Sequence, residues 1–238
     1  MKNSLIKEFD HNSIQGLIFD LDGTLVDTMP TIVTSVGKGL QRRGVKFTSA
    51  EIGKNLFKNL YGAPLPKGIR MVPTLMYRLA RIAGLGRFRS ISFTIEATKR
   101  LSRAYDYAEL FPGTIQLLEA LRDRSKTLGL VSMGSRRGIM KILNRTGIRE
   151  YFSIIISRDE VQRQKPDPEG YLMVQQSMGI PPERIAVVGD MPTDILAAKR
   201  ARMPSIAVTT GLASAEWFQE PATPDFIIGS LEEISECL

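Results

Sequence analysis

Short apolar runs alternate with amphipathic stretches along most of the chain. Between the runs, apolar residues recur at helical spacing over 114–124, 136–146, 169–178 and 194–201. Strands that are separated by single helices predict βαβ crossovers, and therefore a parallel sheet with helices on both faces. We expect an α/β core with a Rossmann-like parallel sheet. Its strands should be Gly16–Asp20, Leu128–Ser132, Ser153–Ser157, Ile185–Asp190, Ser205–Thr209 and Phe226–Ile228.

The segment 28–108 has a different pattern. Helical spacing appears in Thr31–Arg43 and Val72–Ala83, helix breakers occur at 62–64 and 84–86, and no apolar run is typical of a strand. The segment interrupts the βα alternation directly after the first strand, and the chain returns to that alternation at Phe111-Pro112-Gly113. We therefore predict a helical cap domain, residues 28–108, inserted over the active face of a core formed by residues 1–27 and 109–238.

The composition excludes several protein classes. The chain has 238 residues, of which 43% are hydrophobic and 24% charged, as is usual for soluble globular proteins. No stretch approaches the roughly 20 apolar residues of a membrane span, and the polar residues 1–12 lack a secretory core. The single cysteine, Cys237, cannot form an internal disulfide. We expect a cytoplasmic protein, monomeric or homodimeric, without a membrane span.

The positive charge of the chain belongs to the segment 28–108. This segment has 15 Lys or Arg residues against three acidic residues, a formal charge of +12, whereas the remainder is at −5. The basic residues form a solvated surface, or a surface that steers an anionic substrate toward the site, or a contact for phospholipid or nucleic acid. No nucleic-acid-binding motif is visible and the core is acidic, so no nucleic-acid partner is expected. The aromatic residues among the arginines, Tyr77, Phe88 and Phe93, are expected in the core of the cap rather than as base-stacking platforms.

Two carboxylates lie at the end of the first predicted strand. Asp20 and Asp22 are two residues apart, so their side chains point the same way, and Gly23-Thr24 then turns the chain. Two acids this close repel each other, and one takes up a proton unless a cation holds both. The arrangement therefore predicts a divalent cation beside a carboxylate nucleophile.

Other polar residues follow the predicted strands and fit the same chemistry. Ser132 and Asp190 end the strands 128–132 and 185–190, and ligands of such sheets bind beyond the carboxyl ends of the strands. Asp20 could attack phosphorus, with Asp22 as general acid and base. Ser132 could donate to a phosphoryl oxygen and Lys165 could neutralise the charge that develops. Asp190 and Asp194 offer further oxygen ligands, a set that suits Mg²⁺.

Few residues offer a different chemistry. His11 is the only histidine and Cys237 the only cysteine, so a Ser–His or Cys–His mechanism lacks its parts. The chain has no Gly-rich Lys-Ser/Thr phosphate loop and no zinc-binding Cys/His spacing. The sequence therefore favours a mechanism in which carboxylates act as nucleophile and as acid/base.

Four motifs resemble those of the haloacid dehalogenase superfamily, in the same order and at similar spacing over the whole chain. They are Asp20-Leu21-Asp22-Gly23-Thr24-Leu25-Val26-Asp27, Ser132, Lys165-Pro166-Asp167-Pro168 and Gly189-Asp190 with Asp194. The subgroup that they resemble contains phosphoglycolate phosphatase-like and β-phosphoglucomutase-like enzymes. The resemblance implies a HAD-like fold with a helical cap.

The resemblance also implies roles for these residues. Asp20 would be the nucleophile and a magnesium ligand, and Asp22 would be the acid/base that lends its backbone carbonyl to the metal. Asp190 would be the second carboxylate ligand, with Asp194 in support. Dehalogenases proper lack the second aspartate, so Asp22 favours phosphoryl transfer over dehalogenation.

Several alternatives stay open at this stage. Ser132, Met133 and Lys165 are expected to bind the substrate phosphate, although Met133 replaces a small polar residue or Asn of many relatives, and Ser135 could share the role of Ser132. Asp194 could instead cap the helix that follows it. The function expected is that of a magnesium-dependent phosphatase acting on a small phosphorylated metabolite. A phosphomutase with the same core and a non-catalytic module that binds phospho-ligands or membrane surfaces are the alternatives.

Overall fold

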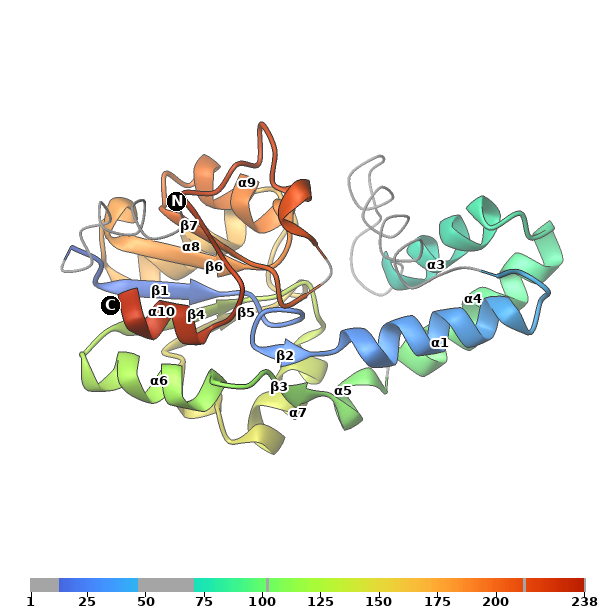
Figure 1. The fold of residues 1–238 in the computed structure, drawn as a ribbon, viewed down its shortest axis with the longest axis horizontal. Helices are drawn as coiled ribbons and strands as arrows, with labels where there is room; N and C mark the ends of the chain where they lie inside the picture. The colour runs from blue at the N-terminus through green and yellow to red at the C-terminus, as the bar shows by residue number, and fades with distance from the viewer. Residues whose placement is uncertain (1–12, 47–70, 102, 212, 238) are drawn as a thin grey trace. The chain divides into compact units, whose positions relative to one another are not determined.

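The computed structural model describes residues 13–46, 71–101, 103–211 and 213–237, which form two compact units (Figure 1). The core unit comprises Met1–Asp27 and Glu109–Leu238, and the helical unit comprises Thr28–Ala108. His11 and the predicted breaker at 62–64 lie outside the described residues. Among the described residues, no helix is long and apolar enough to cross a bilayer.

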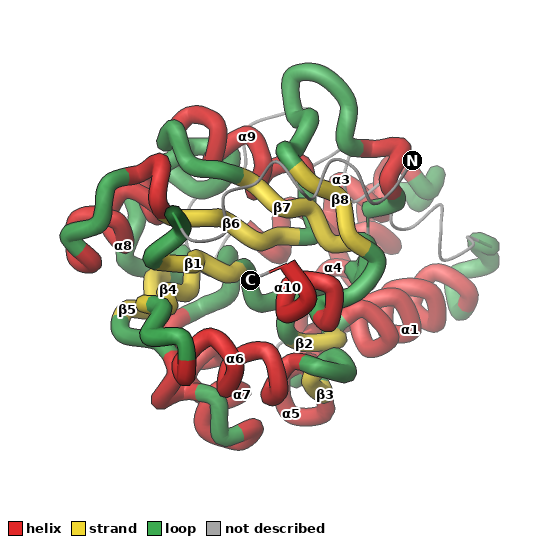
Figure 2. The backbone as a smooth tube through the Cα atoms, turned by 60° about the vertical axis from the view of Figure 1, so that its left-hand side comes forward, coloured by secondary structure: helices red, strands yellow, loops and turns green. Residues whose placement is uncertain are grey.

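The core unit is built on a six-stranded sheet in the order β5-β4-β1-β6-β7-β8, in which every neighbouring pair is parallel (Figure 2). All six predicted strands are confirmed, each ending one residue or less before the expected end. The strands are β1 (Gly16–Phe19), β4 (Thr127–Val131), β5 (Ile154–Ile156), β6 (Ile185–Gly189), β7 (Ser205–Val208) and β8 (Phe226–Ile228). A separate antiparallel ribbon pairs β2 (Val26–Asp27) with β3 (Glu109–Leu110), where the chain leaves and re-enters the core unit.

Helices cover both faces of this sheet. They are α6 (Thr114–Asp123), α7 (Arg136–Thr146), α8 (Glu169–Met178), α9 (Pro192–Arg200) and α10 (Glu232–Cys237). Helices α8 and α9 pack on one face, and α6 and α10 lie on the other (Figures 1 and 2). The core under α8 and α9 joins Ile18 and Val187 of the central strands to Val174 and Ala197 of the helices. Burial on both sides explains why the strands are continuous apolar runs.

The helical unit contains α1 (Met29–Gln41), α3 (Met71–Ile82), α4 (Arg87–Leu101) and the single turn α5 (Ala104–Tyr107). The predicted helices at 31–43 and 72–83 are confirmed as α1 and α3, whereas α4 was not predicted. Gly84 has a φ of 78° between α3 and α4, a conformation that glycine adopts without strain, and this confirms the predicted break. The core of the unit includes Val36, Leu79 and Phe93.

The expectation for the aromatic residues is correct only in part. Phe93 is fully buried, but the side chain of Phe88 is 87% exposed and Tyr77 is half-buried. Helix α4 presents Ser90, Phe93 and Ala97 to the core, at spacings of three and four residues. Phe88 precedes Ser90 by two residues, about half a helical turn, and therefore lies on the opposite face.

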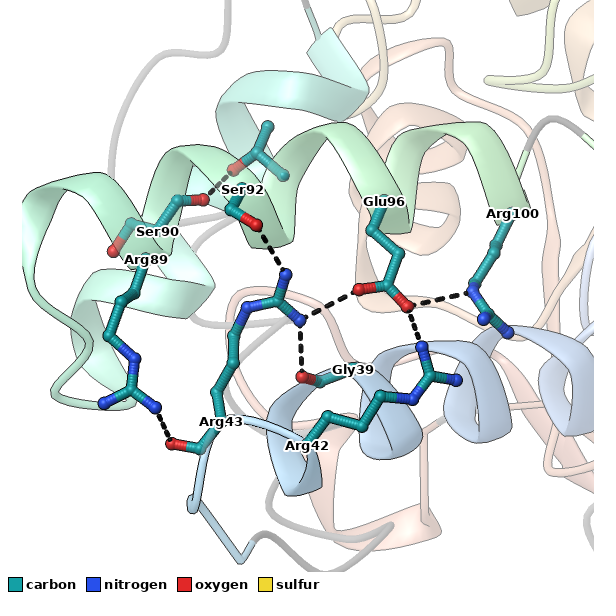
Figure 3. A network of polar contacts seen from close by, with 9 residues as sticks. Gly39, Arg42, Arg43, Arg89, Ser90, Ser92, Glu96 and Arg100 are labelled. Carbon is teal, nitrogen blue, oxygen red and sulfur yellow. Dashed lines mark hydrogen bonds and ion pairs between the residues drawn. The ribbon is translucent and has the colours of Figure 1, made fainter.

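One carboxylate of α4 organises the arginines around the end of α1 (Figure 3). Glu96 accepts a hydrogen bond from Arg43 Nη1 at 2.9 Å, and it forms ion pairs with Arg42 and with Arg100, whose Nε lies 3.2 Å away. Arg43 also donates to the Ser92 hydroxyl at 2.9 Å and lies 5.5 Å from the centre of the Phe93 ring. The network lowers the pKa of Glu96, mainly through the hydrogen bond from Arg43.

Glu96→Gln is expected to lower the free energy of unfolding of the helical unit by about 1–3 kcal/mol at neutral pH. The arginine side chains, of which that of Arg43 is only 13% exposed, would lose their one shared counter-charge. Thermal unfolding followed by helical circular dichroism measures the change. Glu119→Gln, an exposed position on α6, is the matched control and should not alter the melting temperature.

The pH dependence follows from the lowered pKa of Glu96. The stabilisation is complete above the pKa of glutamate in the unfolded chain, and it is lost as the pH falls through the lower folded-state pKa. The wild type and Glu96→Gln should therefore converge in acid. An equal difference between their melting temperatures at neutral and acidic pH would contradict this account of the network.

Candidate active site

The candidate site lies at the carboxyl ends of the three central strands. Asp20 follows β1, Ser132 follows β4 and Asp190 follows β6, and β4 and β6 flank β1 in the sheet. The chain passes from β1 to β4 on one side of β1, and it later enters β6 on the other side. The loops that follow β1 and β6 therefore diverge, which leaves room for a ligand. The backbone amide of Asp20 donates to Val188 O at 2.9 Å, which continues the pairing of β1 with β6 to the first carboxylate.

Lys165 connects the acidic residues of the site. Its Nζ lies 2.6 Å from Asp20 Oδ1 and 2.6 Å from Asp194 Oδ1, and it donates to the backbone carbonyl of Val131 at 2.7 Å. These three acceptors use the three protons of the ammonium group. Because the lysine is buried with all its donors occupied, it is held in one position between the loops.

Burial and like charge perturb the titration of these groups. The pKa of Asp20 is raised to about 7, mainly by burial; Lys165 opposes this shift, and Asp194 and Asp22 add to it. Burial alone would lower the pKa of Lys165, but Asp194 and Asp20 together hold it well above the usual value. The lysine is therefore charged. One ammonium does not balance the carboxylates around it, so the site favours a further cation.

Asp20, Asp190 and Asp194 provide a place for that cation. One carboxylate oxygen from each can be chosen so that all lie within 4.8 Å of one another, and all three residues are buried. A cluster of hard oxygen donors suits Mg²⁺ better than a soft or nitrogen-preferring metal. The residues present thus fit the magnesium ion that the sequence implies.

Two glycines allow Asp190 to lie close to the loops that follow β1 and β7. A Cβ atom would lie 2.3 Å from Asp190 Oδ2 if built on Gly23, whose φ is 88°, and 1.9 Å if built on Gly211. Both distances are shorter than any tolerated contact, so only glycine fits at these positions. Gly23 was noted in the sequence for its turn, and Gly211 was not.

Asp22 lies apart from the carboxylate group formed by Asp20, Asp190 and Asp194. Its Oδ2 accepts a hydrogen bond from the Ser132 hydroxyl at 3.3 Å, and the Ser132 oxygen accepts one from the Gly134 amide at 3.0 Å. The second aspartate is therefore directed toward the predicted phosphate-binding loop. Met133 is half-buried and lines a pocket together with Ser132 and Lys165.

Asp194 caps the helix that begins beside it, one of the two roles that the sequence left open, whereas its role in supporting a metal stays a prediction. It is the third residue of α9, which begins at Pro192 rather than at 194, and its Oδ2 accepts from the Met191 amide at 3.1 Å. Its Oδ1 faces Lys165 and accepts a hydrogen bond from the Tyr171 hydroxyl at 2.9 Å. Capping the helix and contacting the lysine are thus compatible.

Tyr171 is the main residue of the site that sequence reasoning missed. It is fully buried on α8, and the centre of its ring lies 5.3 Å from Lys165 Nζ. Burial raises the pKa of its hydroxyl well above the usual value, so the group is a hydrogen-bond donor to Asp194. Its only signal in the sequence is its place six residues after Lys165, at the beginning of a helix that must pack against the sheet.

The sequence is similar to a known family and to several named proteins. A family model for haloacid dehalogenase-like hydrolases matches residues 17–208. The chain is 31% identical over 227 residues to the pyrophosphatase PpaX of Oceanobacillus iheyensis, covering 93% of this chain and 95% of that protein. It is also 31% identical to the phosphoglycolate phosphatase of Escherichia coli strain K12, covering 94% of this chain and 92% of the relative.

Solved structures show the same fold. A crystal structure of a predicted phosphoglycolate phosphatase from Haemophilus somnus superposes with a TM-score of 0.74 at 21% identity, covering 94% of this chain and 97% of that one. At this coverage the aligned residues come from both units of the chain.

Proposed function

Since the chain belongs to the haloacid dehalogenase-like hydrolases, we propose that it is a magnesium-dependent phosphatase that acts on a small phosphorylated metabolite through an aspartyl-phosphate on Asp20. One observation carries the proposal most strongly. Asp20 lies at the strand end in contact with a buried lysine, inside a group of acids that can hold a cation. Phosphoglycolate and pyrophosphate are the first candidate substrates, because the relatives are named for them.

The residues divide the reaction into two displacements. Lys165 holds Asp20 Oδ1, so the other oxygen attacks phosphorus while the bond from phosphorus to the leaving group breaks. Asp22 gives its proton to the leaving oxygen. In the second displacement, water attacks the same phosphorus, Asp22 takes the proton of that water, and the bond to Asp20 breaks to release phosphate. Mg²⁺ bound at Asp20, Asp190 and Asp194 would supply positive charge for the phosphoryl oxygens.

Ser132 and Lys165 position the phosphoryl group in this scheme. The Ser132 hydroxyl, which donates to Asp22 Oδ2, would turn to a phosphoryl oxygen when substrate binds. The ammonium of Lys165 neutralises charge on the nucleophile and on the phosphoryl group together. We propose that the helical unit is a cap that excludes water during the first displacement, and that its basic residues attract anionic substrates.

Phosphate release in a substrate screen tests the function. Phosphoglycolate, pyrophosphate, sugar phosphates and nucleotides would each be supplied with Mg²⁺ and, separately, with EDTA. The proposal predicts release from at least one of them that EDTA abolishes. Isomerisation of a sugar phosphate without net release would favour the phosphomutase. If no compound is converted, the non-catalytic module becomes the better account, although such a module has no need of Asp22.

A further inference from the structure

A pocket adjoins the predicted phosphate-binding residues. Ser132, Met133 and Lys165 line one part of it, and Arg158, Gln164 and Tyr171 line another. Asp20 is not among the lining residues, so the pocket lies beside the position of the reacting phosphorus and not on it. All of the lining residues belong to the core unit. A group held here would therefore be a neighbour of the transferred phosphoryl group.

The pocket is lined by an arginine whose Nε lacks a hydrogen-bond partner among the described residues. The side chain of Arg158 is only 15% exposed, and its Nε is buried without a hydrogen bond to any residue that the structure describes. The nearest opposite charge is Asp159 Oδ1, 3.7 Å from that Nε and outside hydrogen-bonding distance. Asp159 is 44% exposed, and its other oxygen accepts from the Arg136 amide at 2.8 Å. Buried polar groups are nearly always hydrogen-bonded, so an arginine that lines a pocket and has a buried Nε without a partner points to a ligand.

The other cations of the pocket are occupied. Lys165 contacts Asp20 and Asp194, as described above. Arg163 pairs through its Nε with Asp167 at 3.1 Å and with Glu169 at 3.5 Å, and its side chain is 70% exposed. Among the described lining residues, Arg158 is thus the cation with the least compensated charge.

The backbone ties Arg158 to the phosphate-binding loop. Its amide donates to Gly134 O at 3.2 Å, and the amide of Gly134 in turn donates to the Ser132 hydroxyl oxygen. The two loops that follow β4 and β5 are therefore joined at this point, which fixes the start of the arginine side chain relative to Ser132.

We propose that Arg158 binds a second anionic group of the substrate, beside the phosphoryl group that Ser132 and Lys165 hold. A guanidinium presents paired donors that match a carboxylate or a phosphate, so the substrate class is a phosphate compound with a second oxyanion a few bonds from the first. This proposal rests on the proposed function, because it names the substrate class of the same site. It makes Arg158 a specificity-determining residue with no part in bond cleavage.

Kinetics on matched substrates test the assignment. Phosphoglycolate carries a carboxylate as its second anion, pyrophosphate carries a phosphate, and ethyl phosphate carries neither. Arg158→Gln should lower kcat/KM for whichever of the first two is a substrate by about 10- to 100-fold, mainly through KM, and for ethyl phosphate by less than about threefold. Arg158→Lys should recover part of the loss. Arg184→Gln is the control, because this residue is exposed and precedes β6, at the opposite end of the sheet. It should leave kcat/KM unchanged for every substrate.

Equilibrium binding separates this proposal from the proposed function. In an Asp20→Asn background, calorimetry should show that phosphoglycolate or pyrophosphate binds more tightly than ethyl phosphate, and that Arg158→Gln removes the difference. This result would support the site even if no phosphate were released by the wild type. An equal loss for all three ligands, or no loss for any, would overturn the assignment. Which of the two compounds with a second anionic group loses affinity identifies that group as carboxylate or phosphate.

Discussion

Asp20→Asn is expected to lower the rate of phosphate release by at least about a thousandfold. The amide that replaces the carboxylate has no charge with which to attack phosphorus, and it cannot form the acyl-phosphate. The substitution keeps the shape of the side chain and removes one of several neighbouring negative charges, so the fold should persist. Phosphate release under saturating Mg²⁺ measures the loss, and circular dichroism checks the fold.

A matched substitution elsewhere makes this result specific. Asp123→Asn changes the same group on α6, where the side chain is 75% exposed and its ion pair with Arg122 is 3.9 Å long. Its activity should equal that of the wild type. If Asp20→Asn retained more than about a tenth of the wild-type rate, Asp20 would not be the nucleophile.

Lys165→Met is expected to reduce both activity and stability. Methionine fills much of the same volume, but Asp20 and Asp194 lose the buried ammonium that contacts both of them at 2.6 Å. Removing one partner of a buried ion pair leaves an uncompensated charge and lowers the free energy of unfolding by about 3–5 kcal/mol. Phosphate release should also fall by at least about a hundredfold, since the lysine no longer neutralises the phosphoryl group.

Chemical denaturation and phosphate release measure the two effects of Lys165→Met. Lys199→Met, exposed on α9, should leave both unchanged. A variant with normal stability and a large loss of activity would restrict Lys165 to catalysis. Normal values of both quantities would contradict the central position that the structure gives it.

The central strands of the core could be predicted because they are buried on both faces. Runs such as Ile185–Gly189 are apolar at every position, and glycine or polar residues bound them. The convergence of the site could be predicted for a related reason. In a parallel sheet the carboxyl ends of all strands lie at one edge, so Asp20, Ser132 and Asp190 had to be near neighbours if their strands were adjacent.

Helix α4 could not be recognised because its apolar residues lie on more than one face. Phe93 and Ala97 face the core of the helical unit, while Phe88, Ile91 and Ile95 are between 46% and 87% exposed. Together, residues 88, 91, 93 and 95 do not form the single stripe by which an amphipathic helix is identified. The expectation that Phe88 is buried was wrong for the same reason.

The contributions of Tyr171 and Arg158 depend on three-dimensional contacts that local sequence does not disclose. Tyr171 reaches Asp194, 23 positions away along the chain, only because α8 and α9 pack on the same face of the sheet. Arg158 is distinguished by an Nε without a hydrogen bond, and the 3.7 Å ion pair with its neighbour Asp159 is all that its sequence position suggests. Such features follow from packing and not from residue type.

Trapping the covalent intermediate tests the central claim most directly. Borohydride reduces an acyl-phosphate to the alcohol, so quenching the enzyme during turnover and analysing its peptides by mass spectrometry would locate the phosphorylated carboxylate. We predict homoserine in place of aspartate at position 20, only when substrate and Mg²⁺ are both present. Homoserine at another position, or unmodified Asp20 in an enzyme that is releasing phosphate, would contradict the mechanism.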